Sequence, residues 1–153
     1  MAARNSETSA LHSHLGYWLR FVSNQVSQSF SDKLRAQDVS VAEWVVMREL
    51  YDGERAPSAL AERIAITRGA VTKIADRLIA KTLVTRTASR EDARSQMLAL
   101  TRQGRALVPK LAAIADRNDA EFFGHLSPRE RSTVEDAMKD IVRRLGLKQS
   151  PVD

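Results

Sequence analysis

The middle of this 153-residue chain concentrates side chains that could bind a polyanion. The segment from Arg63 to Arg105 holds ten Lys and Arg residues but only three Asp and Glu residues, a net charge of +7. The whole chain carries +5, so the remaining residues together carry −2. Arginines outnumber lysines by 18 to 6, and a guanidinium group suits bidentate contacts with phosphates and base edges. The pattern predicts a nucleic-acid-binding surface, with a solvated charged face as the alternative.

Other kinds of chemistry find little support. The chain has no cysteine, which excludes disulfides, thiolate metal sites and thiol catalysis. Its three histidines are His12, His14 and His125, and the first two would point apart on a helix, so we expect no metal site. A glycine-rich phosphate loop and a glycine-flanked nucleophilic serine are both missing from the sequence. We therefore expect neither an enzyme nor a bound cofactor.

The hydropathy pattern places the chain away from membranes. No apolar run approaches the roughly 18 residues that a membrane span needs. The first nine residues are polar and carry no apolar signal core, and we expect them to form a frayed tail. The sequence thus predicts a soluble, cytoplasmic protein.

Helical periodicity and capping signals account for most of the chain. Apolar residues recur at steps of three and four from Leu11 to Leu34. Ser40 with Glu43, and Ser127 with Glu130, have the spacing of capping boxes that begin helices. Helices are predicted over residues 11–37, 40–52, 57–64, 67–81, 101–124 and 127–146. The last of these should bury Val134, Ala137, Ile141 and Leu145.

The period changes after Lys81, where two short β-like runs occupy residues 83–87 and 96–100. A charged tip at residues 88–95 separates them, which predicts a two-stranded hairpin. Such a hairpin is not stable alone and must lean on the helices. The fold class is therefore mainly α with a small β-hairpin, an α+β arrangement.

The order of short helix, tight joint, second helix and basic hairpin describes a winged helix-turn-helix. The helix over 67–81 has a polar outer face that would fill a major groove, and the hairpin would reach the adjacent minor groove. A plain helical domain with a hairpin is the alternative, because helix-turn-helix geometry is not unique to DNA-binding proteins.

These segments carry a resemblance to a known family. Residues 67–78, TRGAVTKIADRL, look like the recognition helix of the MarR family of bacterial transcription regulators. Residues 83–86 leading into 91–95 resemble that family's wing, with its Asp-x-Arg tip at Asp92 and Arg94. Residues 98–101 with Gly104 resemble the end of the wing and the start of the next helix. The resemblance spans about residues 11–146.

The resemblance implies an obligate homodimer that binds a palindromic operator on double-stranded DNA and acts as a transcriptional repressor. It also implies a bacterial protein that is associated with the nucleoid when bound to DNA. Residues 1–37 would form a tail and dimerisation helix, 38–101 the DNA-binding unit, and 102–153 further dimerisation helices, all in one compact chain. The apolar stripes of the first and last two predicted helices independently leave more apolar surface than the central unit can cover.

Roles at the DNA are carried over from the family residue by residue. Thr67 and Arg68 would lie at the start of the recognition helix, and Arg94 would enter the minor groove. Asp92 would orient the wing through a salt bridge to a nearby arginine. Thr82 stands where the family usually has glycine, so we expect this helix to end differently. The predicted DNA-binding residues are Thr67, Arg68, Gly69, Thr72, Lys73, Arg77, Arg90, Asp92 and Arg94.

A small phenolic or aromatic acid is the ligand that the resemblance suggests, with release from DNA as its effect. Its candidate pocket residues are Trp18, Trp44, Met47 and Tyr51, although stripes of this kind more often belong to a hydrophobic core. Arg20 and Arg48 are candidates to pair with a ligand carboxylate. Two other functions fit the same sequence: a non-specific architectural DNA-binding protein, and a helical interaction module whose basic wing contacts an acidic partner.

Overall fold

The computed structural model describes residues 8–148, so residues 1–7 of the predicted tail and residues 149–153 lie outside the described part. The helical elements are the 3-10 turn η1 (Leu11–Ser13) and the helices α1 (Leu15–Arg35), α2 (Val41–Tyr51), α3 (Pro57–Ile64), α4 (Arg68–Ala80), α5 (Arg102–Phe123) and α6 (Pro128–Leu145). The strands β1 (Val84–Ala88) and β2 (Gln96–Leu100) form an antiparallel hairpin that pairs Val84 with Leu100 and Ala88 with Gln96.

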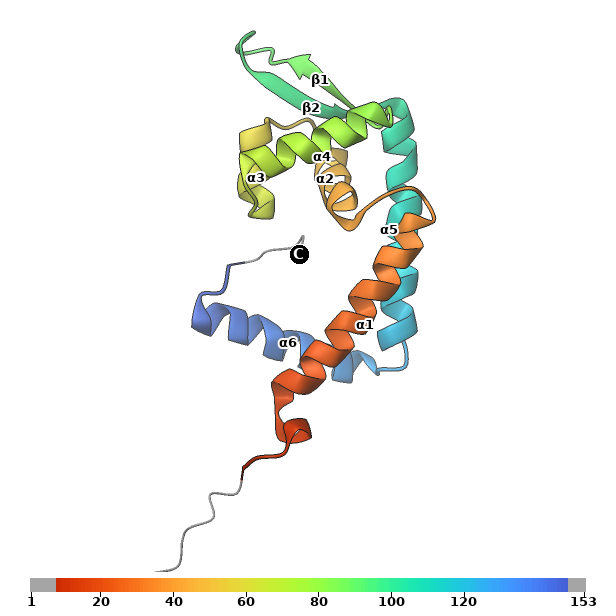
Figure 1. Cartoon of the computed structure of the whole chain (residues 1–153), viewed down its shortest axis with the longest axis vertical. Helices are drawn as coiled ribbons and strands as arrows, with labels where there is room; N and C mark the ends of the chain where they lie inside the picture. Colours follow the sequence, from red (N-terminus) through yellow and green to blue (C-terminus); the bar gives the residue numbers. More distant parts are fainter. Residues whose placement is uncertain (1–7, 149–153) are drawn as a thin grey trace, which may run out of the picture.

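The long helices α1 and α5 lie side by side along the length of the molecule (Figure 1). Helices α2, α3 and α4 and the hairpin gather at one end, and α6 crosses the other end (Figure 1). The described chain is mainly helical with a two-stranded wing, which confirms the predicted winged helix-turn-helix fold.

Local sequence signals set most of the helix ends. Ser40 and Ser127 form the two predicted capping boxes, each with the glutamate three residues later. Thr67 and Thr101 cap α4 and α5 through their hydroxyl oxygens. The first predicted helix is interrupted: η1 ends at Ser13 and α1 begins only at Leu15, with His14 in an extended conformation between them.

The core lies inside the central unit and extends into the ends of the long helices. Leu50, Leu60, Val71, Leu78 and Leu98 are fully buried there. Leu34 of α1, and Val108, Leu111 and Ile114 of α5, complete the same cluster. Val108 and Ile114 of α5 therefore face the core. Their neighbours Leu107 and Ala115 on the same helix are only partly buried.

The hairpin leans on the helices through a contact that the sequence pattern did not reveal. Arg55, in the connection between α2 and α3, exchanges two backbone hydrogen bonds with Leu98 of β2, of 3.0 and 2.8 Å. Because Leu98 is also fully buried, the base of the hairpin is fixed to the central unit.

The prediction that α6 buries its apolar face is wrong for a single chain. Val134, Ile141 and Leu145 are 48%, 44% and 69% exposed, Ala137 is exposed as well, and no residue of α6 is buried. The helix begins next to the end of α5, passes α1 and then projects to one side of the two long helices (Figure 1), so its apolar side has little of its own chain to pack on.

Candidate nucleic-acid interface

The residues that join α3 to α4 determine where α4 begins, and the burial of its apolar residues leaves its polar face exposed. Ala65 adopts the left-handed conformation, with φ of 56°, and ends α3. The Thr67 hydroxyl oxygen then accepts a hydrogen bond of 3.1 Å from the Ala70 amide. With Val71, Ile74, Ala75 and Leu78 buried, the opposite face is left to solvent. That exposed face carries Thr67, Arg68, Gly69, Thr72 and Lys73, all predicted DNA-binding residues.

A groove of about 590 Å³ runs between this helix and the hairpin. Arg68 and Thr72 line it from α4, and Arg86 and Arg94 line it from the hairpin segment. The structure therefore brings Arg68, Thr72 and Arg94 to one concave surface, although 22 to 26 positions separate the helix residues from Arg94 in the sequence.

Ion pairing divides the basic residues of this region into two sets. Arg86 pairs with Asp76 at 2.5 Å and so links β1 to α4. Within residues 8–148, Arg68, Lys73, Arg90 and Arg94 form no ion pair, and all four are exposed. Their positive charge is uncompensated, as a phosphate-binding surface requires.

The tip of the hairpin differs from the prediction in one respect. Among the described residues, Asp92 forms no salt bridge to an arginine. Its carboxylate instead accepts hydrogen bonds from the Arg94 amide (3.0 Å) and the Ser95 hydroxyl (3.3 Å). Short carboxylate side chains commonly bond the backbone two residues later, and such a bond fixes a turn. Asp92 thus shapes the tip locally and leaves the Arg94 guanidinium unpaired.

Arg77 is placed apart from the other predicted contacts. Its Nε donates a hydrogen bond of 3.3 Å to Oε1 of Glu43, a buried carboxylate of α2. Sequence reasoning gave Glu43 a capping role only. Its neighbour Lys81, whose Nζ lies 2.8 Å from Glu43 Oε2, was also missed.

A second buried polar contact, also missed, joins the two long helices. Asn118 of α5 is 3% exposed, and its Nδ2 donates to the Val26 carbonyl at 3.2 Å. Lys33 of α1 donates to Asn118 Oδ1 and Glu121 Oε2, at 2.8 Å each. The available signal was a polar residue on the apolar stripe of the helix predicted over 101–124.

The helix after the joint ends in a way that corrects our expectation for Thr82. Thr82 takes the left-handed conformation, with φ of 61°. Its amide bonds the Ile79 carbonyl and the Leu83 amide bonds the Leu78 carbonyl, each at 2.9 Å. This is the hydrogen-bond pattern with which a glycine normally ends a helix, so α4 ends in the usual way despite the threonine.

The four candidate pocket residues do not form one cluster in the chain. Met47 is fully buried in the core, and Trp44 and Tyr51 are half-buried on α2. Trp18 is 50% exposed on α1, where its ring packs edge-on against Tyr17.

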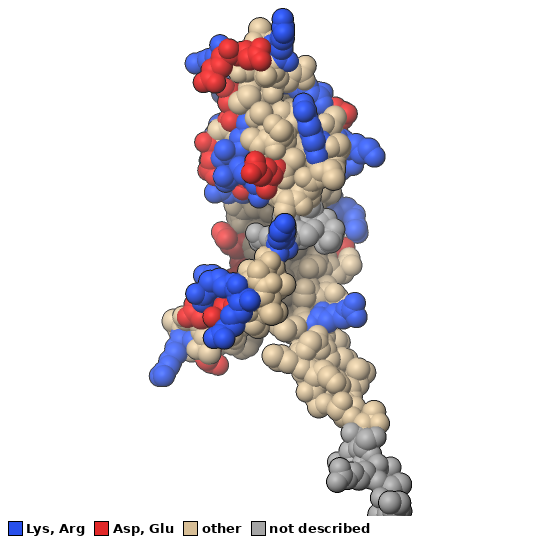
Figure 2. Space-filling model, turned by 90° about the vertical axis from the view of Figure 1, so that its left-hand side faces the viewer, with Lys and Arg blue, Asp and Glu red and all other residues tan. Residues whose placement is uncertain are grey.

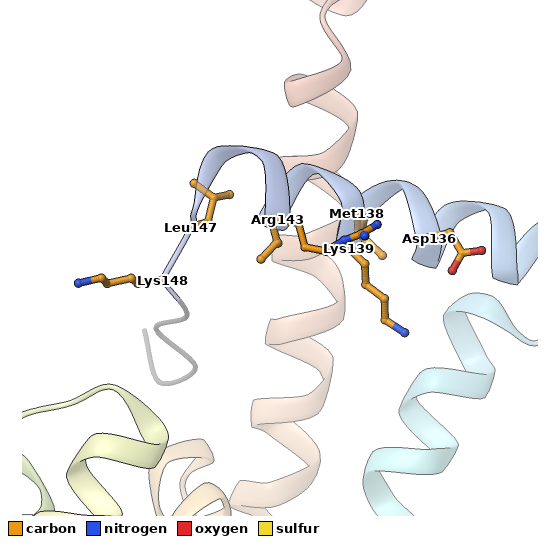
Figure 3. Close-up of a pocket in the computed structure, with 7 residues that line it drawn as sticks. Asp136, Met138, Lys139, Arg143, Leu147 and Lys148 are labelled. Carbon is orange, nitrogen blue, oxygen red and sulfur yellow. The ribbon is translucent and has the colours of Figure 1, made fainter.

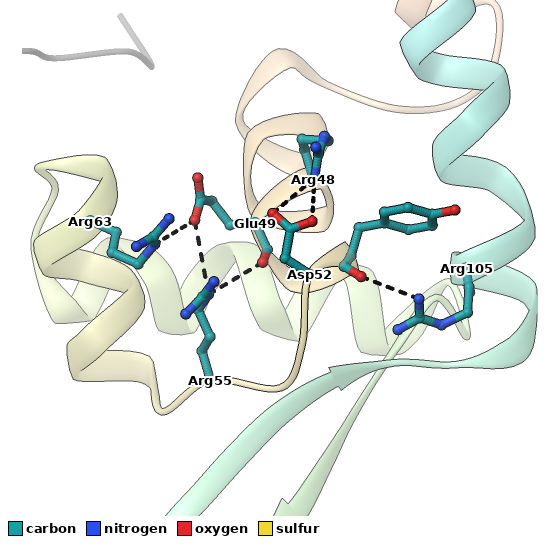
Figure 4. Close-up of polar contacts among 7 residues, drawn as sticks. Arg48, Glu49, Asp52, Arg55, Arg63 and Arg105 are labelled. Carbon is teal, nitrogen blue, oxygen red and sulfur yellow. Dashed lines mark hydrogen bonds and ion pairs between the residues drawn. The ribbon is translucent and has the colours of Figure 1, made fainter.

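The predicted carboxylate partners Arg20 and Arg48 also differ in setting. Arg20 is exposed on α1. Arg48 pairs with Asp52 at 3.1 Å, and its guanidinium lies 5.7 Å from the Tyr51 ring centroid (Figure 4). Arg105 approaches the same ring at 5.2 Å and donates to the Tyr51 carbonyl at 3.2 Å. Nearby, Glu49 of α2 accepts from Arg63 Nε of α3 at 2.6 Å (Figure 4).

Within residues 8–148, no group of three or more His, Cys, Asp or Glu side chains is arranged to hold a metal ion. None of the helices in that range is long and apolar enough to cross a membrane.

Comparison with known proteins agrees with the geometry. A sequence profile of the MarR family matches residues 37–95. The chain is 26% identical over 139 residues to the HTH-type transcriptional regulator SarZ of Staphylococcus aureus, covering 90% of this chain and 93% of SarZ. It superimposes on a point mutant of E. coli MarR complexed with operator DNA with a TM-score of 0.75 and 23% identity, over 88% of this chain and 99% of that one. For Bordetella bronchiseptica BpsR, whose DNA binding is regulated by 6-hydroxynicotinic acid, the TM-score is 0.74 and the identity 24%, over 93% and 99% of the two chains.

The fold and the basic groove, together with these sequence matches, define a DNA-binding transcriptional regulator of the winged helix-turn-helix class. Residues 37–95, which hold the helix-turn-helix and most of the wing, match the MarR family of transcriptional regulators, and the relative SarZ is itself a transcriptional regulator.

Proposed function

We propose that the protein is a repressor that binds a palindromic operator as a homodimer, with α4 in the major groove and the hairpin over the adjacent minor groove. The observation that carries the proposal is the groove shared by Arg68 and Thr72 of α4 and Arg94 of the hairpin tip. In a DNA duplex, one sugar-phosphate backbone separates the major groove from the adjacent minor groove. A helix and a hairpin on either side of a groove in the protein can therefore enter these two DNA grooves and contact the DNA backbone between them.

The proposed contacts divide into base-reading and phosphate-binding roles. Arg68, Gly69 and Thr72 lie at the N-terminal end of α4, where a recognition helix meets base edges. Thr67, Lys73 and Arg90 would bind phosphates around them, and Asp92 would hold the hairpin tip in shape. Arg94 would enter the minor groove.

The homodimer is supported by apolar surface at the end of the molecule opposite the hairpin. On α1, Leu15, Trp18 and Phe21 are 70%, 50% and 54% exposed. Residues 8–31 include a single Lys, Arg, Asp or Glu side chain, that of Arg20, and the surface at the lower right of Figure 2 is mostly tan, whereas charged side chains gather at the lower left. Exposed apolar area of this extent is typical of a protein interface.

The apolar side of α6 adds to that surface. A pocket of about 990 Å³ borders it, lined by the apolar residues Met138, Val142 and Leu147 and by the charged residues Asp136, Lys139, Arg143 and Lys148 (Figure 3). Its three apolar residues would pack against a helix from a second chain. We accordingly assign dimerisation to residues 1–37 and 102–153 and DNA binding to residues 38–101.

Binding measurements on the DNA upstream of the gene test the function. An inverted repeat found there is placed in one duplex, and its scrambled sequence in another. The proposal expects binding about a thousandfold tighter to the repeat at fixed salt, with footprints on two half-sites one helical turn apart. Equal binding to both duplexes would identify an architectural protein instead, and no binding to either would favour the interaction module.

Regulation by a small phenolic or aromatic acid forms the last part of the proposal. The aromatic residues Trp18, Trp44 and Tyr51 would contact it in the dimer, together with Met47 if the core opens there. Its effect requires unequal affinity for the DNA-bound and free forms of the dimer. The test is operator affinity with and without salicylate at millimolar concentration, and unchanged affinity across a panel of aromatic acids would contradict this part. The site of action would be the bacterial cytoplasm, at the nucleoid.

A further inference from the structure

Glu43 of α2 is the only carboxylate buried in the described part of the chain, with 2% exposure. Its two oxygens accept three hydrogen bonds. Oε2 takes one of 3.2 Å from the Ser40 amide and one of 2.8 Å from Lys81 Nζ. Oε1 takes one of 3.3 Å from Arg77 Nε. We call Glu43, Arg77 and Lys81 the Glu43 cluster.

The Glu43 cluster connects three parts of the fold. Arg77 and Lys81 belong to the last turn and the C-cap of α4. Glu43 lies in the first turn of α2, where it also completes the capping box. Lys81 Nζ donates a further hydrogen bond of 2.6 Å to the carbonyl of Asp38, in the joint between α1 and α2, where Asp38 has φ of 57°. The end of α4 is thereby tied to the point at which the chain leaves α1.

Overall stability alone does not account for a buried ion pair. Only the Glu43 carboxylate is buried, since the Lys81 side chain keeps 28% and that of Arg77 54% of its exposure. Removing that carboxylate from water costs about as much as its attraction to the two cations returns, so an apolar contact of the same size would stabilise equally well. Hydrogen bonds to fixed partners, unlike apolar contacts, define a direction. The Glu43 cluster is thus suited to fixing the orientation of α4.

Orientation matters because the proposed base-reading residues lie at the other end of the same helix. Arg68 precedes Arg77 by nine residues, a distance of about 13 Å along the helix axis. A tilt of about 5° at the Arg77 end would displace Arg68 by about 1 Å, more than the roughly 0.5 Å that a binding site tolerates.

We propose that the Glu43 cluster positions the recognition helix, so that Glu43, Arg77 and Lys81 determine operator specificity without touching DNA. The inference rests on the proposed function and reassigns Arg77, which the sequence placed among the DNA contacts. In contrast to Arg68 and Lys73, Arg77 is already paired with a buried carboxylate. Its charge is therefore compensated within the protein.

The first test needs no DNA. The chain has no cysteine, so spin labels at Lys73→Cys on α4 and Lys110→Cys on α5 report one distance between the two helices, in labelled protein diluted with unlabelled protein. We expect Glu43→Gln and Lys81→Met to broaden or shift the distance distribution. Asp119→Asn, which breaks the exposed pair between α5 and α6, should leave it unchanged. An unaltered distribution in both cluster variants would overturn the proposal.

The second test compares an operator duplex with its scrambled sequence. Glu43→Gln should weaken operator binding about tenfold and change scrambled binding by less than about twofold, since non-specific binding depends on phosphate contacts and not on helix orientation. If the loss of a negative charge near DNA were the only effect, Glu43→Gln should instead tighten binding to both the operator and the scrambled duplex. Tighter binding to both duplexes would therefore overturn the positioning role.

Arg77→Met separates positioning from a direct phosphate contact. A positioning residue should lose operator affinity with the salt slope unchanged, and Arg77→Met should add little to Glu43→Gln in the double variant. Equal losses on both duplexes, with a slope smaller by about one, would make Arg77 a phosphate contact and refute the assignment.

Two controls distinguish a failure of the positioning role of the Glu43 cluster from a failure of the proposed function. Thermal unfolding establishes that each variant is folded at the measuring temperature. Lys81→Met is the milder variant, because it leaves Glu43 bonded to Arg77 and to the Ser40 amide. If the unmodified protein does not distinguish operator from scrambled DNA, the proposed function fails, while the spin-label distances still decide whether the Glu43 cluster orients α4.

Discussion

Gly104, in the first turn of α5, lies directly against the backbone carbonyl of Leu83. A Cβ atom on Gly104 would overlap the Leu83 oxygen and stand 3.2 Å from Cδ2 of Leu100. The same carbonyl accepts a hydrogen bond of 3.1 Å from the Thr101 amide. The end of α4, both strands of the hairpin and the start of α5 thus meet at one point, and the absence of a side chain at residue 104 permits it.

Gly104→Ala should destabilise the protein, because the contacting atoms belong to the backbone and cannot rotate away. We expect a loss of about 2 kcal/mol or more in the free energy of unfolding, measured by urea denaturation. Gly69→Ala is the matched control, since its Cβ would meet nothing closer than 4.0 Å, and a helical alanine should leave stability unchanged or slightly higher. Equal stability for the two variants would show that the α5 junction is loosely packed.

Thr82 offers a change in the opposite direction. A β-branched residue at φ of 61° is strained, so Thr82→Gly should raise the free energy of unfolding by about 0.5 to 1 kcal/mol after the entropy of glycine is subtracted. The loss of the exposed hydroxyl contact with Gln103 at 3.0 Å should offset only a small part of this gain. Thr82→Ala, which keeps Cβ but removes the branch, should fall between the two. A less stable glycine variant would mean that the Thr82 side chain contributes more than its strain costs.

Local signals explain how much of this fold the sequence could predict. The caps at Ser40, Thr67, Thr101 and Ser127, together with helical periodicity, located the helices α1 to α6 to within a few residues. They act between residues three or four apart, which a sequence displays directly. The exposed residues of α4 that we propose to face DNA followed from the same periodicity, since the residues that are not buried must face outward.

Contacts between residues that are far apart in the sequence could not be predicted from these local signals. The ion pairs of Glu43 with Arg77 and Lys81 span 34 and 38 positions, and the Arg55–Leu98 bridge spans 43. Nothing in the local pattern distinguishes Arg77 from Lys73, although one is paired with a buried carboxylate and the other is free in the described structure. The burial predicted for α6 failed for a related reason: an apolar stripe shows that a surface should be covered, but not by which chain.

That apolar stripe leads to a prediction about assembly. Ile141→Asp places a charge in the middle of the exposed apolar side of α6, beside Val134, Met138 and Leu145. If this side is the dimer interface, the substitution should weaken dimerisation by at least about 2 kcal/mol per chain, which for the two chains is roughly a thousandfold in the dissociation constant. Sedimentation equilibrium measures the constant directly. Ser132→Asp, on the opposite side of the same helix, is the control. Equal constants for the two variants would move the interface away from α6.

The last prediction separates the roles of the hairpin and of α4. Arg94 is exposed and unpaired within the described residues, so Arg94→Ala should change the free energy of unfolding by less than about 0.5 kcal/mol. If its guanidinium enters a minor groove, operator affinity should fall clearly, and most on duplexes whose contacted minor groove is narrow and A·T-rich, where the potential is deepest. The salt slope should fall by about one.

Arg68→Ala should instead alter the preference among major-groove sequences, by about 1–3 kcal/mol for a good base contact. Arg129→Ala, which removes the same charge from α6 at the far end of the molecule, controls for net charge. Titration of the three variants at fixed salt against duplexes that differ only at central or flanking bases decides the matter. Wild-type affinity and salt slope for Arg94→Ala would show that the hairpin does not contact the minor groove, and DNA binding would then depend on α4 alone.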